Sequence, residues 1–134
     1  MFVAIFDEES RANDASTYLT ELQIGQEVIA QAVLKKNVDG RVLVEKSINA
    51  YPEGEVRETP INSMIDLLRN DPAMSNAQKE AAKRLARIND EFLSDVSKEF
   101  KPGRYALVSD VHRDDMYTVD DRMDALGGNV FRTA

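Results

Sequence analysis

The stretch DVHRDD, residues 110–115, places the only histidine of the chain among three aspartates. In an extended strand the side chains of Asp110 and His112 point to the same side, and Asp114 follows just beyond. Together these three side chains could bind one metal ion. Oxygen ligands with a single histidine fit calcium or magnesium better than structural zinc, which is rarely bound without cysteine. The first candidate function is a metal-dependent enzyme that uses Asp110, His112 and Asp114.

A helix start is a second interpretation of the same residues. Asp114 or Asp115 could cap a helix that begins near Met116, because a carboxylate there accepts hydrogen bonds from backbone N–H groups. Asp120 and Asp121 would then place negative charge near the positive end of that helix. We favour this interpretation, in which the aspartates have a structural role.

The sequence lacks the residues that most other kinds of catalysis require. The absence of cysteine removes thiolate nucleophiles, and His112 is the only histidine that could activate a serine or threonine. Gly127 and Gly128 follow a predicted helix and precede a predicted strand, which is typical of a helix stop and not of a phosphate-binding loop. We therefore expect no catalytic residues and no cofactor.

The composition indicates one soluble domain over residues 1–134. Hydrophobic residues make up 43% of the chain and charged residues 31%, which suffices to bury a core. Twenty-four acidic and 17 basic side chains give a net charge of -7, which repels phosphate backbones and anionic lipids. No apolar run approaches the roughly 18 residues of a spanning helix, and the start lacks a basic leader. We expect a cytoplasmic protein with no transmembrane segment and no nucleic-acid partner.

Hydrophobic periodicity predicts elements in the order β-α-β-β-α-α-β-α-β. Asp39 and Gly40 form a hairpin signal, and Thr59 with Pro60 is typical of a helix start. Ser75, with glutamine three residues on, matches a capping box. The predicted strands span residues 2–6, 28–35, 42–48, 105–111 and 130–133, and the predicted helices begin near residues 10, 60, 76 and 116.

This order predicts an α+β fold, a ferredoxin-like sandwich. Two β-α-β units, residues 2–35 and 105–133, would interleave into one mostly antiparallel sheet with helices on one face. A helical insertion, residues 59–101, would lie between the two units. The whole would form a single domain.

The predicted fold separates two acidic clusters. Asp7, Glu8 and Glu9 follow the first strand and would be natural partners for a metal at His112. The first strand and the strand from Tyr105 would be central and antiparallel, so their C-terminal ends lie at opposite ends of the sheet. We therefore expect the two clusters not to meet.

Residues 76–100 are predicted to form one long helix with an inverted charge distribution. Its first half is basic and its second half is acidic, opposite to the preference of the helix dipole. Two copies packed antiparallel would compensate these charges. A solvated helix with local pairs, such as Glu80 with Arg84, explains the pattern without a partner. The partner we expect is a second copy, bound through this helix or through a sheet edge.

The tyrosines are the remaining candidates for a ligand site. Tyr18, Tyr51, Tyr105 and Tyr117 could line a pocket between sheet and loop. Tyrosines at sheet edges and helix faces are more often packing residues with a solvated hydroxyl, and we favour that role.

Three stretches carry recognisable motifs of fold and turn. They are FVAIFDEESRANDA, AVLKKNVDGRVLVEKS, and FKPGRYALVSDV followed by ALGGNVFRTA. Together they resemble a bacterial family of uncharacterised proteins labelled "predicted membrane protein" or domain of unknown function. In that family a glycine-rich apolar segment follows the hairpin, whereas here the place is taken by ETPINSMIDLLRNDP, which has the pattern of a soluble helix. The resemblance supplies no catalytic residues.

The sequence thus favours a non-catalytic domain that self-associates or binds a small ligand. One alternative is the metal-dependent enzyme at Asp110, His112 and Asp114, which metal analysis with and without chelator would test. Another is a peripheral membrane or stress-related accessory protein, which the resemblance alone suggests and vesicle flotation would test.

Overall fold

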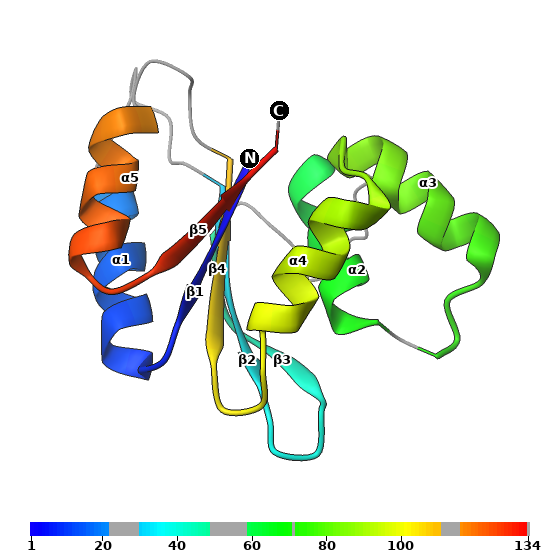
Figure 1. Cartoon of the computed structure of the whole chain (residues 1–134), viewed down its shortest axis with the longest axis horizontal. Helices are drawn as coiled ribbons and strands as arrows, with labels where there is room; N and C mark the ends of the chain where they lie inside the picture. Colours follow the sequence, from blue (N-terminus) through cyan, green and yellow to red (C-terminus); the bar gives the residue numbers. More distant parts are fainter. Residues whose placement is uncertain (22–29, 49–58, 71, 111–115, 134) are drawn as a thin grey trace.

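The computed structural model describes residues 1–21, 30–48, 59–70, 72–110 and 116–133. In this part of the chain, a five-stranded antiparallel sheet in the order β3-β2-β4-β1-β5 is accompanied by five helices (Figure 1). The strands are β1 (Phe2–Phe6), β2 (Gln31–Lys36), β3 (Val42–Ile48), β4 (Tyr105–Ser109) and β5 (Asn129–Arg132). The helices are α1 (Glu9–Glu21), α2 (Pro60–Arg69), α3 (Asn76–Ala86), α4 (Asp90–Glu99) and α5 (Met116–Ala125). The α+β class expected from the sequence is confirmed.

The strands of two β-α-β units alternate in the sheet. β1 and β2, which flank α1 in the chain, both pair antiparallel with β4 and lie on either side of it. β4 and β5, which flank α5, both pair antiparallel with β1 in the same way. Each unit therefore places one strand between the two strands of the other. β3 extends the sheet beyond β2 and forms one edge.

Local sequence chemistry sets several element ends. Gly40 adopts a φ of 88° in the turn between β2 and β3, a conformation that glycine reaches without steric cost. Thr59 caps α2, and Pro60 is its first residue. Ser75 and Gln78 form a reciprocal capping box at the start of α3. The hairpin and both helix starts therefore agree with the sequence.

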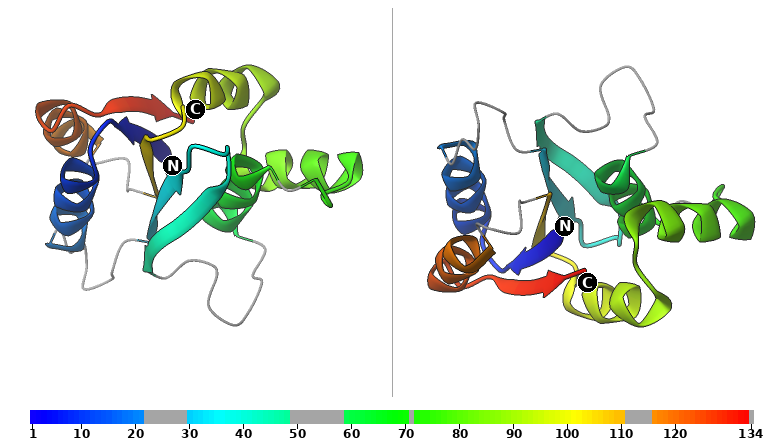
Figure 2. Two further views of the ribbon diagram at one scale, coloured as in Figure 1. Left: turned by 90° about the horizontal axis from the view of Figure 1, so that it is seen from below. Right: turned by 90° about the horizontal axis from the view of Figure 1, so that it is seen from above.

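Helices cover both faces of the sheet, not one face as expected (Figures 1 and 2). α1 and α5 pack on one face, and the insertion formed by α2, α3 and α4 lies on the other. The physical reason lies in the two central strands, β1 and β4, in which all five residues are buried. Because successive strand residues point to opposite faces, strands that are apolar at every position need cover on both sides.

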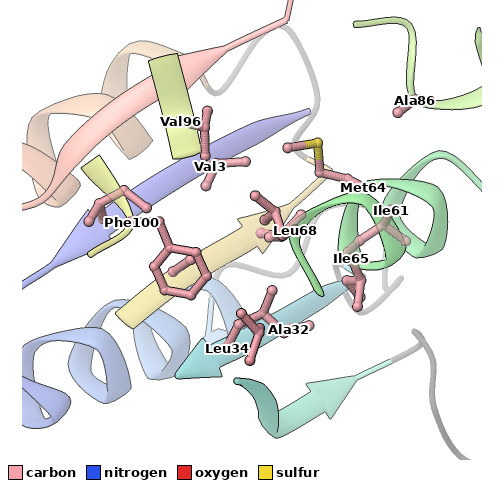
Figure 3. Packing of buried hydrophobic residues seen from close by; sticks show 14 residues of the cluster. Val3, Ala32, Leu34, Ile61, Met64, Ile65, Leu68, Ala86, Val96 and Phe100 are labelled. Atoms are coloured by element: carbon pink, nitrogen blue, oxygen red, sulfur yellow. The ribbon is translucent and has the colours of Figure 1, made fainter. Parts of the chain in front are cut away.

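Two hydrophobic clusters follow from this arrangement. On the insertion face, Val3 and Ile5 of β1 pack with side chains of α2 and α4. Figure 3 shows this cluster from close by, with Phe100 and Met64 directed toward the strands. On the other face, Phe2 and its neighbours pack with α1 and α5. α2 is the best buried helix, with seven of its ten residues buried, because α3 packs on its outer side.

Residues 76–100 form two helices, and the single long helix expected from the sequence is wrong. α3 ends at Ala86, and its cap residue Arg87 adopts a left-handed φ of 58°. α4 begins after Asn89, whose side chain accepts a hydrogen bond from the Phe92 N–H at 2.8 Å. A straight helix of this length would extend about 37 Å and carry its second half away from the sheet. The break instead returns α4 to the sheet, where Val96 is buried.

Candidate functional site

The structure describes one of the three predicted metal ligands. Asp110 follows β4, and its backbone N–H donates a hydrogen bond to the Ala30 carbonyl at 3.2 Å. Its side chain is 60% exposed, with one carboxylate oxygen 3.7 Å from the Met1 amino group. His112 and Asp114 lie outside the described residues. The metal site, and the alternative of an aspartate cap for α5, therefore stay predictions.

Asp7 and Asp110 lie at opposite ends of the sheet, as the topology predicted. β1 and β4 run antiparallel, with Phe2 opposite Ser109, so the residues that follow each strand are directed apart. Asp7 forms an ion pair with Arg104, which precedes β4, at 3.0 Å. Within the described ranges, no group of three histidine, cysteine, aspartate or glutamate side chains is placed to hold a metal ion. Asp7 and Asp110 thus each lie beside a basic group.

A buried polar network, not predicted from the sequence, connects α1 to the sheet. Ser16 Oγ donates a hydrogen bond to Gln31 Oε1 at 2.6 Å, and Gln31 Nε2 donates to Thr20 Oγ1 at 2.9 Å. Ser109, opposite Gln31 in the sheet, donates to the Ala30 carbonyl at 3.0 Å. Among the described residues, every buried side-chain nitrogen and oxygen has a hydrogen-bond partner. Because its groups are satisfied, the network fixes α1 on the sheet.

The tyrosines that the structure describes lie in three different elements. Tyr105 of β4 is buried, and Tyr18 of α1 packs against the same hydrophobic cluster. The Arg122 guanidinium lies 5.0 Å from the centre of the Tyr18 ring. Tyr117 of α5 is 87% exposed, and Tyr51 lies outside the described residues. The first two are packing residues, and the third belongs to the surface.

The helix break also explains the charge pattern of residues 76–100. Lys83 lies in the last turn of α3 and Asp90 in the first turn of α4, so each charge favours the dipole of its own helix. Lys83 Nζ lies 2.5 Å from Asp90 and 2.6 Å from Glu80. Hydrogen bonds to Asp90 and Glu80 raise the pKa of Lys83. Antiparallel packing of two copies is therefore not needed to compensate these charges, and association through this segment stays a prediction.

α3 and its cap residue Arg87, here called the basic arm, lie at one end of the long axis of the molecule. Figures 1 and 2 show α3 against α2 and away from the sheet. The helix buries two of its residues, Ala82 and Ala86. Arg84 and Arg87 are exposed, and Leu85 is 38% exposed. The arm carries four basic side chains and one acidic side chain, in a chain that is acidic as a whole.

α1 and α5, here called the acidic layer, lie at the opposite end of the long axis (Figure 1). Their six acidic and two basic side chains are Glu9, Asp14, Glu21, Asp120, Asp121, Asp124, Arg11 and Arg122. Asp120 accepts hydrogen bonds from Arg132 Nε of β5 at 2.8 and 2.9 Å. Asp121 and Asp124 are exposed and lie on the same side of α5 as Tyr117, at i, i+4 and i+7. The molecule thus carries an exposed aromatic ring among carboxylates at this end.

Comparison of the chain with protein-family models, with curated proteins and with solved structures found no match. The family resemblance noted in the sequence stays an expectation. In the described part of the chain, no helix has the length and apolar character needed to cross a membrane.

Proposed function

We propose that this protein is a non-catalytic interaction domain that associates with copies of itself, built on a ferredoxin-like core. The observation that supports this proposal is the division of charge between the basic arm and the acidic layer at opposite ends of the long axis (Figure 1). Each surface also exposes an apolar side chain, Leu85 on the arm and Tyr117 on the layer. Tyrosine and arginine are enriched in protein interfaces. A second copy offers each surface its complement.

The β3 edge is a less favourable route to association. The pairing register of β2 and β3 shifts between Val33 and Leu34, which leaves Glu45 as an extra residue in β3. Glu45 and Lys46 are both exposed in the middle of this edge strand. A bulge and charged side chains are devices that discourage edge-to-edge pairing of sheets. The arm is therefore the better supported of the two surfaces.

Light scattering at protein concentrations from micromolar to millimolar tests self-association. At low salt we expect the average mass to rise with concentration, because exposed charges then attract over a long distance. The screening length falls from about 8 Å at 0.15 M salt to about 3 Å at 1 M, so high salt should return the mass toward that of the monomer. A monomeric mass under all of these conditions would contradict the proposal.

A further inference from the structure

We infer that the association is head-to-tail, with the basic arm of one copy docked on the acidic layer of the next. This inference rests on the proposed self-association and adds which surfaces meet. α3 and α5 lie at opposite ends of the long axis (Figure 1), and the side chains that would dock lie on the side of each helix away from the sheet. The two docking faces therefore point in opposite directions, and a single two-fold contact cannot join arm to layer in both directions. Each contact instead leaves one arm and one layer free, and the assembly grows unless it closes into a ring.

The outward face of the arm has the shape of a narrow ridge. Ala77, Ala81, Arg84 and Leu85 share one side of α3 at i, i+4, i+7 and i+8. Ala82 and Ala86, the two buried residues of the helix, lie on another side. The small side chains allow a partner helix to approach closely. Leu85 supplies an apolar contact, and Arg84 supplies a charge beside it. Arg87, just beyond the helix, extends the basic surface.

The outward face of α5 matches this ridge in length and is opposite in charge. Tyr117 supplies a flat apolar ring for Leu85, and a tyrosine loses little conformational freedom on binding. Asp121 and Asp124 follow along the same stripe as carboxylate partners for the two arginines of the ridge. Arginine pairs with carboxylates through two parallel hydrogen bonds, which fixes the direction of docking. One helix on one helix is a small contact, so we expect weak association.

An anionic lipid surface is the other occupant that the arm charges would attract. A second copy fits better, because the ridge exposes a single large apolar side chain, Leu85. A helix that inserts into a membrane surface needs a broad apolar face.

Two neutral variants test the direction of docking. Arg84→Gln with Arg87→Gln removes the arm charges and keeps the layer, whereas Asp121→Asn with Asp124→Asn removes the layer charges and keeps the arm. We expect each variant alone to stay monomeric at concentrations where the original protein associates. Their equimolar mixture should form a heterodimer that does not grow further, because only one functional arm and one functional layer remain in each pair. Circular dichroism of each variant checks the fold.

Matched control variants carry the same charge changes on α4 and just beyond its end. Lys98→Gln with Lys101→Gln, and Glu91→Gln with Asp95→Asn, alter exposed side chains and should self-associate as the original protein does. If the original protein associates and the arm and layer variants associate equally well, the docking inference fails while self-association stands. A mixture of the two docking variants that stays monomeric also overturns head-to-tail docking. If the original protein is monomeric but binds phosphatidylserine vesicles through the arm, both proposals fail in favour of a lipid surface.

Discussion

The two helical layers of this protein are attached to the sheet in different ways. On one face α1 and α5 each contact the strands directly, and polar contacts fix both helices: Ser16 to Gln31 for α1, and Asp120 to Arg132 for α5. On the other face α2 contacts the strands, while α3 contacts α2. α2 is buried on both sides as a result, and α3 buries two alanines.

This difference shows that the order in which the helices stack on the sheet determines how much of each helix is buried. A helix between the sheet and a second helix is buried on two sides, and Ile61, Met64, Ile65 and Leu68 of α2 fill the sheet side (Figure 3). The outermost helix needs only a narrow contact with its neighbour and is free to carry charge. We therefore expect local stability to be lowest in α3 and highest in the helices fixed directly to the sheet.

The largest expected effect concerns Phe100, the residue that follows α4. Its side chain is 2% exposed and packs in the cluster on the insertion face. Phe100→Ala should lower the free energy of unfolding by about 3 to 5 kcal/mol, because it leaves a cavity against the sheet. Leu85→Ala on α3 is the control and should change it by less than about 0.5 kcal/mol, as is usual for exposed positions. Urea unfolding measures both, and an equally large loss in Leu85→Ala would show that the arm is part of the core.

A smaller effect is expected from the helix start at Asn89. Asn89→Ala removes the side chain that accepts a hydrogen bond from Phe92 N–H, and loss of such a cap costs about 1 kcal/mol. Native-state hydrogen exchange should then accelerate in α4 and α3, while α1 and α5 keep their protection. Asn13→Ala on the exposed side of α1 is the matched control, since this asparagine lies inside a helix. Equal acceleration in α1 would mean that the two layers open together and the comparison fails.

Elements whose ends carry their own chemistry could be predicted from the sequence. Gly40 in the hairpin, Thr59 before Pro60, and Ser75 with Gln78 each determine a turn or a helix start through one or two residues. These features depend on neighbours in the chain and not on the rest of the fold. The same reasoning extended to topology, since the antiparallel central strands separate Asp7 from Asp110 as expected.

The break between α3 and α4 could not be predicted in the same way. Arg87, Ile88 and Asn89 include no glycine or proline, and the apolar spacing from Leu85 to Phe92 continues through them. Packing against the sheet decides the break, because only a bent segment can cover it. The available signal was the charge inversion, with basic residues where one helix ends and acidic residues where the next begins.

Contacts between side chains of different elements could also not be predicted from the sequence. The hydrogen bond between Ser16 and Gln31 depends on how α1 lies on β2, which neither stretch determines alone. Ser16 and Thr20 at i and i+4, on the same side as Leu19, formed a weak signal for a polar contact beneath α1. The sequence predicted that the insertion is helical. The face of the sheet on which these helices lie became clear only from the burial of β1 and β4 on both faces.

The smallest expected effect concerns Asp66 of α2, the helix that lies between the sheet and α3. Burial raises the pKa of Asp66 above its ordinary value, and the charge of Arg69 opposes this in part. The folded state therefore holds the proton more tightly than the unfolded state, so the free energy of unfolding falls as the pH rises from the ordinary aspartate pKa through the raised one. Asp66→Asn removes the ionised group and should raise the melting temperature at pH 7. At a pH below the ordinary pKa the variant and the original protein should differ little, since both side chains are then neutral.

Asp14→Asn on the acidic layer is the control for Asp66→Asn, because Asp14 is exposed on α1. We expect the difference in melting temperature between this variant and the original protein to stay small across the same pH range. If the melting temperature rises in a pH-dependent way in Asp66→Asn alone, the destabilisation arises from a charge buried in α2. The same gain in Asp14→Asn would instead indicate repulsion spread over the whole acidic chain. The distinction between α2, which is buried on two sides, and α1, which is buried on one, would then lose its electrostatic support.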